Sequence, residues 1–129
     1  MSPVYRATFT NDLRNVALAR NAIASFARLC GFSEEDVADI RLAAGEALSN
    51  AAEHGRGVRP GGFSVRCQFE NGEFAVEVQD SGSGFQAEPA ETDGPAERGR
   101  GISIMRRLMH SLAFSKNGTR VRMVKRLSV

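Results

Sequence analysis

SEEDVADIRLAAGEALSNAAEHG, residues 33–55, is expected to form one long helix, because its apolar positions follow the helical period. At about 3.6 residues per turn, one stripe of that helix is wholly apolar. The stripe is formed by Val37, Ile40, Ala44, Leu48 and Ala51. Glu46 and Asn50 share a face roughly opposite it. The sequence therefore predicts a helix that packs through its apolar side and keeps a polar pair available for chemistry.

The expected ends of this helix are marked by residue type. Ser33 is expected to cap its start, and the acidic residues that follow favour the positive end of the helix dipole. Gly55 is expected to end it. Gly45 lowers helix stability by roughly 1 kcal/mol relative to alanine, so helix stability alone does not select it. We expect it to help a ligand approach the polar pair, together with its small neighbours Ala43, Ala47 and Ser49.

Composition places the chain among ordinary globular proteins. With 129 residues and 42% hydrophobic residues, a single domain spanning residues 1–129 is expected to bury a core. The 17 basic residues nearly balance the 15 acidic ones, so direct binding to nucleic acid is not indicated. The basic residues of the C-terminal third are expected to form solvated faces. They are Arg98, Arg100, Arg106, Arg107, Arg120, Arg122, Lys125 and Arg126.

The two cysteines and the hydropathy pattern indicate an intracellular protein. Cys30 and Cys67 lack metal-ligand spacing and occupy apolar positions, which favours buried free thiols over a disulfide. There is no signal-peptide pattern, and no apolar run approaches the roughly 18 residues of a membrane span. We therefore expect a cytoplasmic protein that does not bind membranes.

The N-terminal half shows an edge strand, a helix and a hairpin around the long helix. Residues 4–9 are rich in strand formers, and Thr10 or Asn11 is expected to cap the helix that follows. The apolar stripe of that helix comprises Leu13, Val16, Ala19, Ile23, Phe26, Ala27 and Cys30. Strict alternation then predicts strands over residues 63–70 and 74–80, joined by a tight turn at Asn71-Gly72.

The C-terminal half repeats the pattern after a long irregular segment. Residues 86–98 show no periodicity, which is typical of a lid, a binding loop or plain disorder. Gly99-Arg100-Gly101 is expected to open a third helix, whose stripe is Ile102, Met105, Leu108 and Met109. A second hairpin over residues 112–127 turns at Asn117-Gly118. The element order predicts an α+β two-layer sandwich, a mixed, mainly antiparallel sheet with three helices on one face.

Three separate features share one chemical explanation, which is nucleotide binding. Glycines before a helix leave backbone N–H groups free for phosphate, so the start of the third helix from Gly99 to Ile102 is a candidate cradle. Arg98 or Arg100 would assist it. Asn50 offers Mg²⁺ an oxygen ligand, and this ion usually keeps waters and substrate phosphates for its other positions.

The adenine-reading feature lies at the end of a predicted strand. Asp80 can accept a hydrogen bond from an exocyclic amine, and Gly82 and Gly84 behind it let the backbone approach a base. Taken singly, such a segment is most often an ordinary turn, and Glu46 or Asn50 alone is most often a surface residue.

Other kinds of site that these residues could form have less support in the sequence. There is no P-loop motif, and Gly82-x-Gly84 lacks the third glycine of a dinucleotide fingerprint. A glycosidase pair of Glu46 and Asp80 has no further support in the sequence. His54 and His110 lack a second ligand at metal spacing, and His54 is most simply a favourable residue at the end of its helix.

The joint occurrence of the three segments in order carries a family resemblance. Residues 46–55, EALSNAAEHG, residues 80–84, DSGSG, and residues 99–102, GRGI, closely resemble the N, G1 and G2 boxes of the GHKL ATPase superfamily, the Bergerat fold. The short chain has no helix with a phosphoacceptor histidine, and its segment GISIMRRLM is also similar to the stand-alone anti-sigma-factor serine kinases of that superfamily.

The resemblance implies a role for each matching residue. Asn50 would hold Mg²⁺, Asp80 would read adenine, and Gly82 and Gly84 would shape the base pocket. Residues 86–98 would form the ATP lid, and Glu46 would be the general base toward a substrate serine or threonine. The residues expected at the phosphates of ATP are Arg98, Gly99, Arg100, Gly101 and Ile102.

The resemblance also implies partners. Such kinases phosphorylate a STAS-domain anti-anti-sigma protein and alternatively sequester an RNA polymerase sigma factor, commonly as a homodimer. Two alternatives stay open at this point. One is a nucleotide-gated binding module without phosphoryl transfer, and the other is the ATPase domain of a histidine kinase. Retention of Glu46 favours the serine/threonine kinase.

Overall fold

The computed structural model describes residues 2–54, 61–81, 96–116 and 118–128, with the backbone alone at residues 96–99. The expected order of elements is confirmed. The elements are β1 (Val4–Thr10), α1 (Leu13–Leu29), α2 (Glu34–His54), β2 (Gly62–Glu70), β3 (Glu73–Asp80), α3 (Ala96–Leu108), β4 (Ser111–Ser115) and β5 (Arg120–Arg126).

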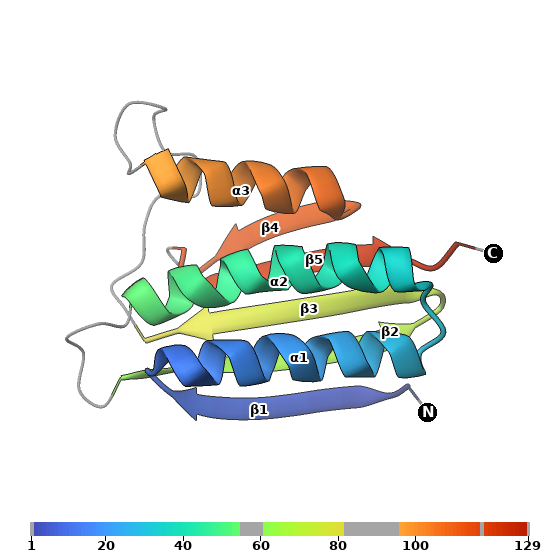
Figure 1. Cartoon of the computed structure of the whole chain (residues 1–129), viewed down its shortest axis with the longest axis horizontal. Coiled ribbons are helices and arrows are strands. Elements are labelled where there is room, and N and C mark those ends of the chain that lie inside the picture. Colours follow the sequence, from blue (N-terminus) through green and yellow to red (C-terminus); the bar gives the residue numbers. More distant parts are fainter. Residues whose placement is uncertain (1, 55–60, 82–95, 117, 129) are drawn as a thin grey trace.

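The strands form one sheet in the order β1-β2-β3-β5-β4, and the three helices cover one of its faces (Figure 1). Every pair of neighbouring strands is antiparallel, so the described sheet contains no parallel pair. The predicted two-layer α+β architecture is confirmed. Asn71 and Gly72 make the β2–β3 turn with φ values of 53° and 76°, the left-handed conformations that a tight hairpin requires.

The core lies between the sheet and α2, where the two predicted periodicities meet. The whole apolar stripe of α2 is buried, and none of its members exceeds 3% exposure. Opposite it, β2 and β3 bury every second residue, including Phe74, Val76 and Val78. Ser33 caps α2 as predicted, because its hydroxyl accepts a hydrogen bond from Asp36 N at 3.1 Å. Gly55, the expected end of the helix, lies outside the described residues.

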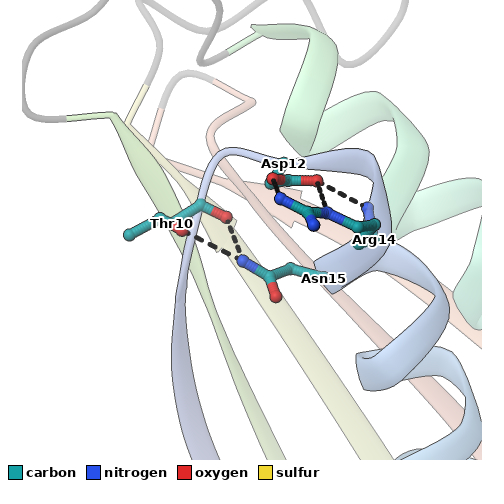
Figure 2. A network of polar contacts seen from close by, with 4 residues as sticks. All are labelled: Thr10, Asp12, Arg14 and Asn15. Carbon is teal, nitrogen blue, oxygen red and sulfur yellow. Dashed lines mark hydrogen bonds and ion pairs between the residues drawn. The ribbon is translucent and has the colours of Figure 1, made fainter.

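The cap of α1 differs from the prediction. Asp12, not Thr10 or Asn11, is the N-cap, and its Oδ1 accepts a hydrogen bond from Arg14 N at 2.8 Å (Figure 2). Thr10 still pairs with β2, so it cannot serve as the residue that turns into the helix. Its carbonyl and hydroxyl oxygens instead accept hydrogen bonds from Asn15 Nδ2 at 2.9 and 3.0 Å.

Asn11 has a different task at the same turn. Its Nδ2 donates to the carbonyl of Ala52 at 2.8 Å, so it satisfies one of the carbonyls that the last turn of α2 leaves without a helical partner. Leu13, predicted in the stripe of α1, is 76% exposed. It is the first residue of the helix, one turn before the buried stripe begins at Val16.

The start of α3 also differs from the prediction. The helix begins at Ala96, three residues before the expected Gly99, so residues 96–98 of the predicted lid are helical. Alanine and glutamate at positions 96 and 97 are good helix formers, and a glycine at 99 costs only about 1 kcal/mol. The rest of the predicted lid, Gly82, Gly84 and Asn117 lie outside the described residues.

Lys125 is the exception among the basic residues that were expected on solvated faces. It is 8% exposed, and its Nζ donates to the carbonyl of Leu108 at 2.6 Å. The same Nζ lies 3.4 Å from Asp39 Oδ2 and 4.0 Å from Asp36 Oδ1. The first turns of α2, the end of α3 and β5 are therefore joined at one buried charge.

Both cysteines are free thiols, as predicted. Cys67 is buried in β2, and burial raises its pKa to about 12, while Cys30 is half-buried. Within the described ranges, no helix combines the length and the apolar character that crossing a membrane requires.

Candidate functional site

Three segments that are distant in sequence come together at one end of the molecule. The C-terminal end of α2, the end of β3 and the start of α3 lie side by side there (Figure 1). These segments carry the polar pair, Asp80 and Gly101. The tertiary structure therefore brings together the three features that the sequence indicated separately.

Gly101 lies directly against the polar pair of α2. A Cβ atom at this position would stand 3.1 Å from Glu46 Oε1 and 3.8 Å from Asn50 Nδ2. Any larger residue would crowd the carboxylate of Glu46. Glycine at position 101 therefore lets the first turns of α3 approach the two polar side chains closely.

Glu46 and Asn50 are half-exposed, and within the described part of the chain neither side chain has a hydrogen bond or an ion pair. No group of three or more potential metal-ligating acids, histidines or cysteines occurs among the described residues. An unpartnered amide oxygen beside an unpartnered carboxylate, at the first turns of a helix, nevertheless fits an ion that is mostly coordinated by phosphates and water. Mg²⁺ bound to ATP is such an ion.

A pocket opens beside this pair, between α2 and the sheet. Its walls combine small or apolar side chains with a few polar ones, a mixture that small-molecule sites commonly have. The lining residues are Ala47, Asn50, Ala51, His54, Val78, Asp80, Met105, Phe114, Gly118, Thr119 and Val121.

Asp80 is the buried acid of this pocket. Its side chain is 4% exposed, and its Oδ2 lies 3.2 Å from His54 Nδ1. Its backbone N–H donates to the carbonyl of Thr119 at 2.8 Å. The carboxylate is therefore placed in the pocket wall, where it can accept a hydrogen bond from an exocyclic amine of a ligand.

The remaining predicted phosphate-binding residues lie at the start of α3. Arg100 is exposed, whereas Ile102 is 7% exposed and belongs to the core. Because α3 begins at Ala96, the backbone N–H groups of Gly101 and Ile102 lie inside the helix and not among the four free N–H groups at its start. The side chain of Arg98 is not described. Gly99, whose backbone was predicted to belong to the same cradle, lies within α3.

Two polar residues of the pocket wall, His54 and Thr119, were not predicted from the sequence. His54 was interpreted as an end-of-helix residue; it does end α2, but its side chain is 7% exposed and contacts Asp80. The signal was present, because His54 lies four residues after Asn50 and therefore on the same helix face. Thr119 lines the pocket because β5 pairs with β3, a neighbour relation that no local pattern reveals.

Gly45 has a different neighbour from the one expected. A Cβ at Gly45 would stand 3.1 Å from Cδ of Arg20 in α1, so the glycine lets that long side chain cross α2. The prediction that Gly45 helps a ligand approach is therefore wrong for this residue. It is buried at a contact between helices, on the side of α2 that faces α1.

Comparison with known proteins agrees with this geometry. Residues 9–125 match the model of the histidine kinase-like ATPase domain. The chain belongs to this family. An ATPase domain binds nucleotide, and the match includes α2, the end of β3 and the start of α3.

Two curated relatives match most of this chain. An anti-sigma F factor of Clostridium botulinum is 30% identical over 132 residues, which cover 94% of this chain and 92% of that protein. The serine-protein kinase RsbW of Listeria innocua is 31% identical over 93 residues, which cover 70% of this chain and 59% of the kinase.

A solved structure shares the fold. The crystal structure of the RsbU and RsbW domains of a Mycobacterium tuberculosis protein matches 97% of this chain with a TM-score of 0.71 and 20% identity. This chain corresponds to 32% of that longer one.

Proposed function

We propose that this chain is an anti-sigma factor and an ATP-dependent serine/threonine protein kinase. It phosphorylates a STAS-domain anti-anti-sigma protein and sequesters an RNA polymerase sigma factor. The observation that carries the catalytic part is the contact of Gly101 with Glu46 and Asn50, because it places a carboxylate and an amide at the first turns of α3. The names of the relatives, an anti-sigma F factor and a serine-protein kinase, support the choice of partners.

In this proposal each end of ATP has its own residues. The adenine lies in the pocket at Asp80, with Gly82 and Gly84 behind it. The phosphates lie near the start of α3, at Gly99 and Gly101, with Arg98, Arg100 and Ile102 beside them. Residues 86–98 act as the lid, and the last three of them belong to the first turn of α3. Asn50 holds Mg²⁺, which would neutralise charge on the phosphate oxygens.

Glu46 acts as the general base. The substrate hydroxyl oxygen forms a bond to the γ-phosphorus, the bond between that phosphorus and the β–γ bridging oxygen breaks, and ADP leaves. Glu46 accepts the hydroxyl proton. The two polar residues lie one helical turn apart, so one rigid element positions both the base and the metal ligand.

The proposal extends to assembly and location. The chain works as a single domain over residues 1–129, as a homodimer in the cytoplasm, without direct contact with nucleic acid or membrane. The near balance of charge, 17 basic and 15 acidic residues, supports a protein partner rather than nucleic acid.

The test is transfer of labelled γ-phosphate from ATP to a STAS-domain protein of the same genome. We expect acid-stable label with the wild-type chain and at least about 100-fold slower transfer with Glu46→Gln, because general-base catalysis contributes about 10² to 10⁴ in rate. The affinity for ATP should stay within about twofold, because the substitution leaves the proposed ATP contacts in place. Ser49→Ala, an exposed change beside Glu46, is the matched control.

Each other outcome rejects part of the proposal. Wild-type transfer by Glu46→Gln would remove Glu46 from the role of base. Nucleotide-dependent sigma binding without any transfer would show a binding module. Acid-labile label would show the chemistry of a histidine kinase instead of a serine/threonine kinase.

A further inference from the structure

His54 and Asp80 form a buried polar pair in the wall of the nucleotide pocket. His54 is the last residue of α2 and Asp80 is the last residue of β3, so the pair joins the helical layer to the sheet. Their side chains are 7% and 4% exposed, and Nδ1 of His54 lies 3.2 Å from Oδ2 of Asp80. Both residues line the pocket.

The chemistry of the two groups defines the direction of this hydrogen bond. In the proposed role, the Asp80 carboxylate accepts hydrogen bonds, and Nδ1 of His54, 3.2 Å from Oδ2, is then the donor. The backbone N–H of Asp80 is bonded separately to the carbonyl of Thr119 at 2.8 Å. The main chain of Asp80 is therefore held by the sheet, whereas His54 holds its carboxylate from the helix.

We propose that His54 is a positioning residue that fixes the carboxylate of Asp80 and thereby makes the pocket select a 6-aminopurine over a 6-oxopurine. This inference rests on the proposed role of Asp80 in reading adenine. The 6-amino group donates to a carboxylate, whereas the 6-oxo group of guanine presents a second acceptor to it. Because His54 holds the Asp80 carboxylate in place, the carboxylate cannot rotate away from the 6-oxo group of guanine. The two facing acceptors then lower the affinity for guanine fully.

The position of His54 separates this role from chemistry at the phosphates. The side chain contacts Asp80 in the base pocket, whereas the proposed catalytic pair lies against Gly101, one and two helical turns earlier on α2. Loss of the His54 hydrogen bond should therefore change the affinity for ATP and the choice of base. It should leave the rate of transfer at saturating ATP unchanged.

Two substitutions distinguish a hydrogen-bond role from simple packing. His54→Phe keeps a ring of similar size and removes the donor. His54→Asn loses most of the ring and keeps an amide N–H near the place of Nδ1. We expect His54→Phe to bind ATP about 10-fold more weakly and to lose most of the preference for ATP over GTP, while His54→Asn stays within about threefold of wild type.

The measurements are calorimetric titrations with ATP and with GTP, together with KM and kcat for phosphate transfer. KM for ATP should rise about 10-fold in His54→Phe at unchanged kcat. Thermal unfolding establishes that each variant is folded. If His54→Phe does not fold, His54→Gln carries the same expectation, because its amide nitrogen matches Nε2 rather than Nδ1.

A double-mutant cycle with Asp80→Asn tests whether His54 acts through Asp80. In the Asp80→Asn background, His54→Phe should produce no further loss of ATP affinity. Additive losses would overturn the inference, as would equal losses in His54→Phe and His54→Asn, or wild-type selectivity in His54→Phe.

The same data separate this inference from the proposed function. If Asp80→Asn weakens ATP binding and His54→Phe does not, the pocket assignment stands and the role of His54 falls. If the wild-type chain shows no preference for ATP, or if Asp80→Asn binds ATP normally, the adenine-reading role of Asp80 falls and takes the inference with it.

Discussion

Both halves of α2 lie near α3, but only the N-terminal half is joined to it through a buried charged residue. Near the start of α2, Asp36 and Asp39 share the buried Lys125, which also donates to the last carbonyl of α3 at Leu108. Toward its end, Glu46 and Asn50 lie against Gly101 in the early turns of α3. At the first place, the Lys125 ammonium group joins the two helices. At the second, the side chains of Glu46 and Asn50 lie beside α3 without an ion pair.

The comparison separates the polar groups that stabilise the fold from those that we propose to bind nucleotide. Lys125 has its partners within the protein, so its charge is already compensated in the absence of any ligand. Glu46 and Asn50 are half-exposed and have no such partner among the described residues, so in the proposed function they stay available to a bound nucleotide. Substitutions at the two ends should therefore change different quantities.

Asn50→Ala should have the largest effect and should act on binding alone. Removal of the only proposed protein ligand of Mg²⁺ is expected to lower the affinity for Mg-ATP at least about 100-fold, while the free energy of unfolding changes by less than about 1 kcal/mol. Calorimetric titration and urea denaturation measure the two quantities. Ser49→Ala is the control, and unchanged affinity in Asn50→Ala would refute the assigned metal ligand.

Lys125→Met should show the reverse pattern. Methionine keeps most of the packing but leaves the Leu108 carbonyl and the Asp39 carboxylate without their cation, which should destabilise the fold by about 2 kcal/mol. The ATP affinity should stay within about twofold. Urea denaturation measures the loss, and Arg122→Met, at a half-exposed position of the same strand, is the control. Equal stability of the two variants would mean that the buried charge of Lys125 does not stabilise the fold.

Gly101→Ala should have the smallest effect, and it should change stability and phosphate transfer in different directions. Alanine favours a helix by about 1 kcal/mol over glycine, so the stability should stay equal or rise. The new Cβ would crowd Glu46 Oε1, and we expect about 10-fold slower phosphate transfer. Unfolding and transfer are measured side by side with Ser103→Ala, an exposed change on the same helix. Wild-type transfer would show that the close approach is dispensable.

Local periodicity predicted most of the fold correctly. The stripe of α2, the alternation of β2 and β3 and the Asn71-Gly72 turn are patterns within about 20 residues, and each one follows from backbone geometry alone. Two of the errors fall where a residue contacts a second element. Thr10 was unavailable as a cap because it pairs with β2, and Gly45 faces a side chain of α1 rather than a ligand.

The candidate site was predictable in part, because several of its residues lie in short motifs. The helical spacing of Glu46 and Asn50 indicated that pair, and the place of Asp80 at the end of a predicted strand indicated the acid. Thr119 carries no such signal, since it reaches the pocket only through the pairing of β5 with β3. His54 carried the spacing signal, but its burial could not be read from position alone.

Most helices and strands and their apolar faces follow from the sequence alone, because they depend on patterns within one helix or one hairpin. The pairing of charged and polar groups, in contrast, depends on how these elements pack together. Lys125 meets Asp39 across 86 positions of the chain, and His54 meets Asp80 across 26. Such distant neighbours determine whether a polar group is paired within the protein, as Lys125 is, or stays available to a ligand, as we propose for Glu46 and Asn50.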